Sequence, residues 1–295
     1  MREFFLICLL VFNLIAFEVT PTRVYEKTLV IKKEINLLKE ELSLTKEKKY
    51  KDVSVDLKPR HVWQRSYMVL MKINILRERL GFPKITVGSM EAVKRIDPIL
   101  PFEQTLRILA EIDILKLRLG VDKKVSFEKI KSRKNPIDVF NSLAYISYQL
   151  DILNTKEITP SYVFSEVMRI YEDVDLILNK LNIEDITYPP KKEKSTPADS
   201  FDATFAVIKE LQRLQKNAAI ERIDFSVFKR EDKILPSDVF NMVMMINAET
   251  QTIKAYLGIK DLTKPAKEFE DKTPADVHQL LHWIAKRLSI IKNLR

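Results

Sequence analysis

The sequence predicts an all-α protein made of two tandem, internally duplicated four-helix bundle units. Glycine is scarce, with 4 among 295 residues, prolines recur at a near-constant interval, and one short interval divides them into two quartets. Scarce glycine argues against a turn-rich β fold, and the apolar spacing has the period of helices. A continuous α-helical repeat solenoid is the alternative architecture, because it too stacks helices that bury one face.

Each predicted helix opens at a proline, which suits the first helical position because its missing N–H would be unpaired there. The eight prolines are Pro21, Pro59, Pro98, Pro136, Pro160, Pro197, Pro236 and Pro274. Residues able to cap the first turn precede six of them: Thr20, Asp97, Asn135, Thr159, Thr196 and Thr273. Four aspartates two residues further on are predicted to be caps rather than catalysts: Asp138, Asp199, Asp238 and Asp276.

Apolar residues follow each proline at steps of three and four, which is the spacing of a buried helical stripe. The residue ten positions after the proline is apolar in every helix: Ile31, Val69, Ile108, Ile146, Ile170, Val207, Ile246 and Ile284. So is the residue seventeen positions after it: Leu38, Leu76, Leu115, Leu153, Ile177, Leu214, Ile253 and Ile291. These sixteen residues are the predicted core.

The helix ends repeat as well. Gly81, Gly120, Asn182 and Gly258 each stand twenty-two residues after a proline, and an apolar residue follows each one. Glycine and asparagine tolerate the left-handed conformation that closes a helix in a Schellman-type stop. We therefore expect helices of roughly 22 residues.

The intervals between prolines are 38, 39, 38, 24, 37, 39 and 38 residues, so the short interval separates two similar quartets. We assign the first four-helix unit to residues 20–156 and the second to residues 157–295. Connectors of about 16 residues inside each unit are long enough to run the length of a helix, which leaves helix direction open. The short step from Asn154 to Thr159 predicts antiparallel or sharply bent neighbours.

Residues 1–19 are predicted to be a signal peptide or an N-terminal anchor. Arg2 precedes an apolar run over residues 4–17, which has the length of a signal h-region and is short for a membrane span. We expect export to the periplasm or the extracellular space, with inner-membrane anchoring if the segment stays attached. Cys8 is the only cysteine, so a processed chain would have no thiol for a disulfide or a metal site.

The net charge is +9, and the densest basic stretch runs from residue 121 to residue 135. Such a stretch is usually a solvated connector, with contact to an anionic envelope surface as the alternative. Basic and aromatic residues are not interleaved as they are in single-strand binders, so we expect no nucleic-acid partner. Membrane contact is expected only through an uncleaved N-terminal segment.

His278 and His282 have the spacing that places two metal ligands on one helix face. Other helices carry aromatic or apolar residues at these positions, so packing is the simpler interpretation and metal binding is the weaker alternative. The sequence contains no glycine-rich phosphate loop, and no motif selects a catalytic group. We therefore expect no cofactor and no enzymatic activity.

The last two helices carry Met242, Met245, Leu280 and Trp283 at positions that are mostly polar or small elsewhere. Burial against the other unit or under a connector would explain them, and a partner surface is the alternative. The sequence thus predicts a non-catalytic, exported binding or scaffold protein whose partner is another protein or an envelope surface. A sensor-like small-molecule-binding module is the alternative function.

Overall fold

A computed structural model describes residues 18–44, 50–85, 96–127, 129–154, 158–230 and 232–294. All but the last two residues of the predicted signal peptide or anchor therefore lie outside the described residues. In the described part, the predicted all-α fold is confirmed, with no strand. The helices are α1 (Pro21–Glu41), α2 (Pro59–Arg79), α3 (Ile99–Leu119), α4 (Pro136–Asn154), α5 (Pro160–Lys180), α6 (Pro197–Asn217), η1 (Ser226–Phe228), α7 (Pro236–Tyr256) and α8 (Pro274–Ser289). None of the described helices combines the length and hydropathy needed to cross a bilayer.

Seven of the α-helices begin at the predicted proline, and α3 begins one residue later, at Ile99. There the N–H of Ile99 donates to a carboxylate oxygen of Asp97 at 3.0 Å. The capping role of the four aspartates is confirmed, because each accepts a hydrogen bond from the backbone N–H of the residue before its proline. The donors are Asn135, Thr196, Leu235 and Thr273, at 2.6–2.9 Å.

The predicted helix stops are also confirmed. Gly81, Gly120, Asn182 and Gly258 all have positive φ, and Ser43 and Ala219 take the same conformation at the same offset in α1 and α6. The next residue in each case donates its N–H to a carbonyl five residues earlier. One example is Phe82 to Arg77 at 2.9 Å, and Ile259 to Lys254 is another at the same distance. This is the main bond of the Schellman motif.

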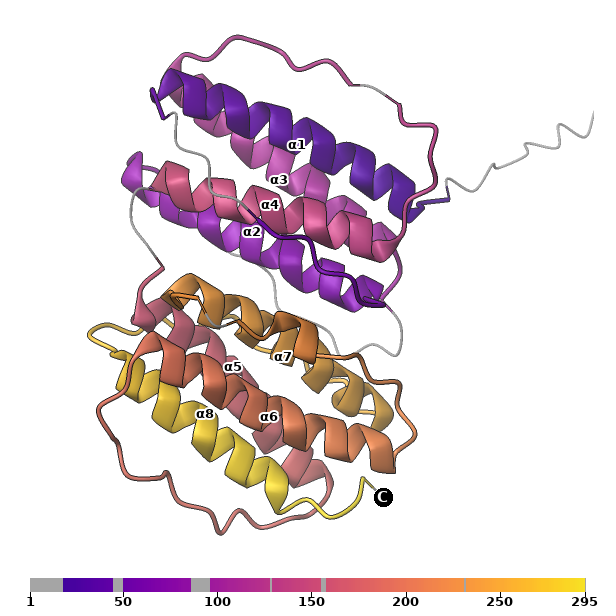
Figure 1. Cartoon of the computed structure of the whole chain (residues 1–295), viewed down its shortest axis with the longest axis vertical. Helices are drawn as coiled ribbons and strands as arrows, with labels where there is room; N and C mark the ends of the chain where they lie inside the picture. Colours follow the sequence, from indigo (N-terminus) through magenta and orange to yellow (C-terminus); the bar gives the residue numbers. More distant parts are fainter. Residues whose placement is uncertain are drawn as a thin grey trace, which may run out of the picture.

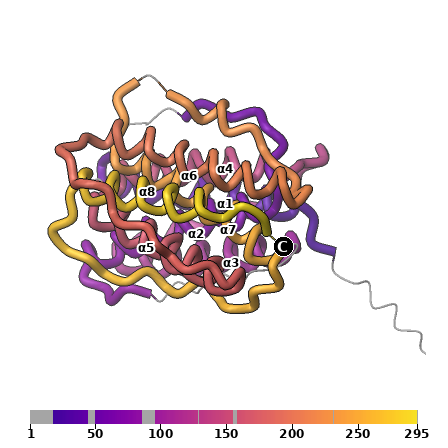
Figure 2. Tube along the Cα trace, turned by 90° about the horizontal axis from the view of Figure 1, so that it is seen from below, coloured from indigo at the N-terminus to yellow at the C-terminus, as the bar shows by residue number. Residues whose placement is uncertain are grey.

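The four helices of each group run parallel (Figure 1). Pro21, Pro59, Pro98 and Pro136 line one small cavity, so α1 to α4 all begin at the same end. The prolines that open α5 to α8 converge in the same way. In the first group α3 and α4 each pack against both α1 and α2, so α1 and α2 are diagonal. In the second group α7 and α8 each pack against both α5 and α6, which gives the same arrangement. Connectors return along the outside of the helices, as Figure 2 shows.

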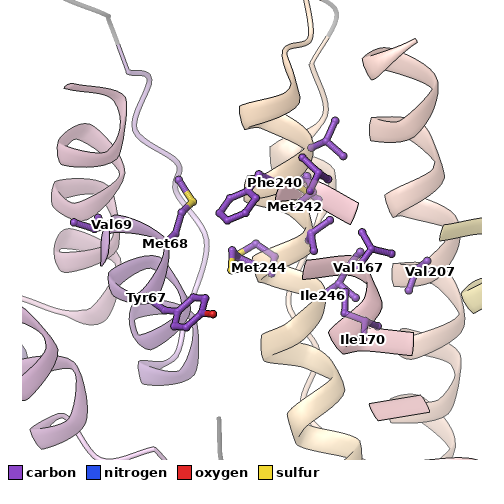
Figure 3. Packing of buried hydrophobic residues seen from close by; sticks show 14 of the residues in the cluster. Tyr67, Met68, Val69, Val167, Ile170, Val207, Phe240, Met242, Met244 and Ile246 are labelled. Atoms are coloured by element: carbon purple, nitrogen blue, oxygen red, sulfur yellow. The ribbon is translucent and has the colours of Figure 1, made fainter. Parts of the chain in front are cut away.

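The predicted core is confirmed residue by residue. All sixteen side chains at ten and seventeen positions after the prolines are 0% exposed. They include Val69 and Ile170, the second of which Figure 3 shows inside the second bundle. An invariant spacing places these residues at the same two heights in each parallel helix, so they form layers across the bundle.

The two bundles lie antiparallel to each other, and α2 contacts α7 between them. His61 near the start of α2 meets Glu249 in the second half of α7, and Tyr162 near the start of α5 reaches Glu78 near the end of α2. α4 and α5 therefore run antiparallel, which is one of the two arrangements predicted for the helices on either side of the step from Asn154 to Thr159. Because each group of four closes on itself, the packing favours the bundle over the continuous solenoid.

A buried ion pair occurs at the same place in both bundles. Lys116 of α3 pairs with Glu34 of α1 at 2.6 Å, and Lys254 of α7 pairs with Asp173 of α5 at 2.6 Å. Both lysines stand eighteen residues after their prolines and both acids thirteen residues after theirs. This correspondence supports the internal duplication, which stays a prediction together with the unit boundaries 20–156 and 157–295.

Candidate functional site

The structure buries the two methionines proposed as part of a partner surface. Met242 and Met245 of α7 are 2% and 1% exposed. Figure 3 shows why α7 is apolar on more than one side: its Phe240 and Met244 face Met68 of α2, across the contact between the bundles. Phe240 and Met244 are thus buried against the other bundle, and Met242 and Met245 belong to the same hydrophobic core.

Trp283 of α8 lies against the connector that joins α5 to α6, and Leu280 is buried in the hydrophobic core. Leu280 is 6% exposed, and the indole N–H of Trp283 donates to the Thr187 hydroxyl of that connector at 3.0 Å. The Trp283 ring also packs on Tyr171, with centroids 4.9 Å apart. Met242, Met245, Leu280 and Trp283 therefore do not form a free surface.

A buried polar cluster joins the bundles beside the apolar contact. Glu249 of α7 accepts hydrogen bonds from Nε2 of His61 at 2.7 Å, Nε of Arg60 at 3.0 Å and the side-chain amide of Gln215 at 2.6 Å. The backbone N–H of Lys58 donates to Nδ1 of His61 at 2.9 Å, so the ring proton sits on Nε2 and points at Glu249. No sequence pattern marked this cluster in advance.

The cluster shifts the pKa values of both of its central groups. Burial lowers the pKa of His61 below its usual 6.5. Burial opposes ionisation of Glu249, but the hydrogen bond from His61 and the charge of Arg60 prevail and hold the pKa of Glu249 at about 2. At neutral pH the cluster is therefore a neutral histidine that donates to an ionised glutamate. It has the character of a structural link between the bundles.

An exposed apolar stripe runs along α3. Leu117 is 79% exposed, and Ile99, Leu106 and Ile114 are each exposed by more than 40%, with exposed Ala110 between them. Residues 106, 110, 114 and 117 follow one another at steps of four, four and three, so they share one face of the helix. That spacing gives α3 a second apolar stripe beside its buried one, and it was readable in the sequence.

The counterpart of this stripe in the second bundle is covered. The positions of Leu106, Ala110 and Leu117 correspond to Met244, Ala248 and Ala255 of α7, counted from the opening prolines. Those three α7 residues are buried. The contact between the bundles joins α2 to α7, so it is heterologous, and the corresponding outer face of α3 has no comparable contact with the second bundle.

The cavities enclosed by the helix starts are too small for a ligand, and the larger hollows lie outside them. The two cavities where helix starts converge measure about 10 Å³ each, which is room for no more than one water. A cleft of about 720 Å³ lies between the bundles. Its lining includes Tyr67 of α2, Tyr162 of α5, and Lys84 and Phe269 in connectors. The sensor-like alternative therefore has more than one place of suitable size in the described chain, because a hollow of about 1070 Å³ also lies beside the starts of α1, α3 and α4.

The basic stretch at 121–135 is a connector, as expected. It packs along α1, where the N–H of Ile130 donates to Glu26 at 3.1 Å and the N–H of Lys134 donates to Thr22 at 2.9 Å. Most of its basic side chains remain exposed, including Lys124, Lys131 and Arg133. Contact with an anionic surface therefore stays a prediction.

His278 and His282 do come together. Their Nε2 atoms lie 3.1 Å apart on α8, and both residues are partly exposed. Among the described residues no cluster of three or more histidines, cysteines and acids has the geometry to hold a metal ion.

Comparison with protein-family models, curated proteins and solved structures gives no match to this chain.

Proposed function

We propose that the protein is a non-catalytic binding or scaffold protein that acts outside the cytoplasm, and that the α3 face binds a helix of another protein. The observation that carries the proposal is the apolar stripe formed by Ile99, Leu106, Ala110, Ile114 and Leu117. Contiguous exposed apolar residues on one helix face are typical of contact surfaces. A helix laid along such a stripe is a common recognition mode.

The contact between α2 and α7 indicates what kind of helix would fit. On α7 the corresponding face meets an apolar centre, Met68, flanked by Arg65, which donates to the Asn241 side chain at 2.6 Å. On α3 the position of Asn241 is taken by Glu103, which is exposed. A carboxylate there would hold an arginine or lysine more strongly than an amide does. We therefore infer a partner helix with an apolar centre and basic residues at its edge.

The charges on α3 disfavour a second copy of the chain as this partner. In an antiparallel pairing that sets Ile99 against Leu117, Glu103 of one copy faces Asp113 of the other. In a parallel pairing, Glu103 faces Glu103. Like charges placed against each other across an interface cost free energy.

The experiment is photo-crosslinking in cells from position 106. A benzoylphenylalanine placed at Leu106 is expected to link to a separate polypeptide, at a helix that carries basic residues beside its apolar face. The same group placed at Lys209, an exposed residue of α6, is the positional control. Links only within the chain, links only between two copies, or no links would each refute the proposal.

A quantitative test then uses the purified partner. Leu117→Glu should weaken binding by about tenfold or more, because burying a leucine contributes about 1.5–3 kcal/mol. Leu262→Glu is the matched control, since Leu262 is 46% exposed but lies in the connector after α7. Equal loss of affinity in the two variants would mean that the α3 face is not the binding site.

A further inference from the structure

The histidine pair on α8 has a geometry that packing alone does not require. The Nε2 atoms of His278 and His282 are 3.1 Å apart, and the rings meet edge to face with centroids 4.5 Å apart. Within the described residues, the only hydrogen bond of either ring is the one to the other ring. The contact brings two imidazole nitrogens of one helix face close enough to reach a single ion.

That separation matches two ligands on one metal ion. Imidazole nitrogens bind Zn²⁺ at about 2.0–2.1 Å, and with bonds of that length a 3.1 Å separation corresponds to an angle at the metal of about 100°. This angle lies between the tetrahedral and the square-planar values, so it suits both Zn²⁺ and Cu²⁺. We propose that His278 and His282 chelate one divalent transition-metal ion through their Nε2 atoms.

The site is open to a metal ion. Both histidines are partly exposed, and a spacing of four residues places them on one face of α8.

The site supplies two protein ligands, and no third group in the described chain completes the coordination. Water fills the remaining positions, which both rings allow because they are partly exposed. For a nitrogen site of this kind Cu²⁺ binds more tightly than Zn²⁺. This inference is independent of the α3 face, which belongs to the other bundle.

The test is titration of the untagged full chain with Cu²⁺ and with Zn²⁺ at pH 7.4, followed by calorimetry. We expect one metal ion per chain, tighter binding of Cu²⁺, and a melting temperature that rises with metal and returns on adding a chelator. His278→Gln and His282→Gln should each weaken binding about tenfold or more, since losing a group that only supports a ligand already costs about 10–100-fold. Lowering the pH to 5 should release the metal, because protonated imidazole cannot bind it.

The double variant carrying both substitutions retains His61, so binding that survives in it does not belong to the pair. Equal Cu²⁺ affinity in the wild-type chain and the double variant would overturn the proposal, as would the absence of saturable binding. Electron paramagnetic resonance of the Cu²⁺-loaded wild-type chain provides a measurement that needs no variant. It should show two equivalent nitrogen ligands, and a spectrum without nitrogen coupling would also overturn the proposal.

Discussion

Replacing Glu249 by glutamine tests whether the polar cluster between the bundles contributes to stability as its geometry implies. The side chain is 1% exposed and receives hydrogen bonds from His61, Arg60 and Gln215. Glutamine keeps the size but removes the charge that these donors surround. Because one pKa unit corresponds to about 1.4 kcal/mol, lowering the pKa of Glu249 from 4.5 to about 2 corresponds to about 3 kcal/mol.

The sign of the pH dependence follows from the direction of that shift. A carboxyl group with a lowered pKa in the folded protein stabilises it fully above the unfolded pKa of about 4.5, and this contribution disappears as the pH falls through the folded value. The Glu249→Gln variant should therefore be about 3 kcal/mol less stable than the wild-type chain at pH 7. By pH 3 the difference should narrow by about 2 kcal/mol.

The assay is urea unfolding followed by circular dichroism at both pH values. Glu210→Gln is the matched control, because Glu210 pairs with Arg213 on the surface of α6 and such pairs contribute about 0–1 kcal/mol. A loss below about 1 kcal/mol at pH 7 for Glu249→Gln would refute the calculation. A difference that does not change between pH 7 and pH 3 would show that the charge of Glu249 is not what stabilises the fold.

Three further predictions concern stability measured by the same urea assay. Asp173→Asn should lower the free energy of unfolding by about 3–5 kcal/mol, because it leaves the fully buried Lys254 without a counter-charge. A change near zero would mean that the ion pair is solvated. Ala219→Gly should raise stability by about 0.5–1 kcal/mol, because Ala219 has a φ of 53°, and a destabilised variant would contradict the left-handed stop. Wild-type stability should fall between pH 7 and pH 5 by up to about 1.4 kcal/mol per unit. The cause is His61: burial lowers its pKa in the folded protein, so the unfolded chain binds a proton first. The His61→Gln variant should not show this fall in stability between pH 7 and pH 5. An equal fall in the variant and the wild-type chain would mean that other groups cause it.

The parts of the fold that the sequence predicted are those set by local, repeated chemistry. Caps such as Asp199, stops such as Gly120 and core positions such as Ile146 depend on a few neighbouring residues and on the helical period. The start of α3 was predicted one residue too early, at Pro98. Because the Asp97 carboxylate caps the N–H of Ile99, the helix begins at Ile99.

Helix direction and the contact between the bundles were beyond local reasoning. Connectors of about 16 residues can span a helix in either sense, so parallel packing depends on the whole quartet. For the same reason the apolar sides of α7 and α3 could not be distinguished in the sequence. Met244 is buried because its face of α7 packs on α2 of the other bundle, whereas the corresponding face of α3 has no such contact and Leu106 is exposed.

The diagonal placement of α1 and α2 has a consequence for how the chain folds. Consecutive helices such as these cannot form a local hairpin, and α1 instead packs against α3 and α4, whose residues follow it by more than fifty positions. Mean sequence separation between contacting residues is therefore high for an all-helical protein, and folding rates fall as that separation grows. We expect each quartet to fold slowly and in one cooperative step once its fourth helix has been synthesised, with no stable two-helix intermediate before it.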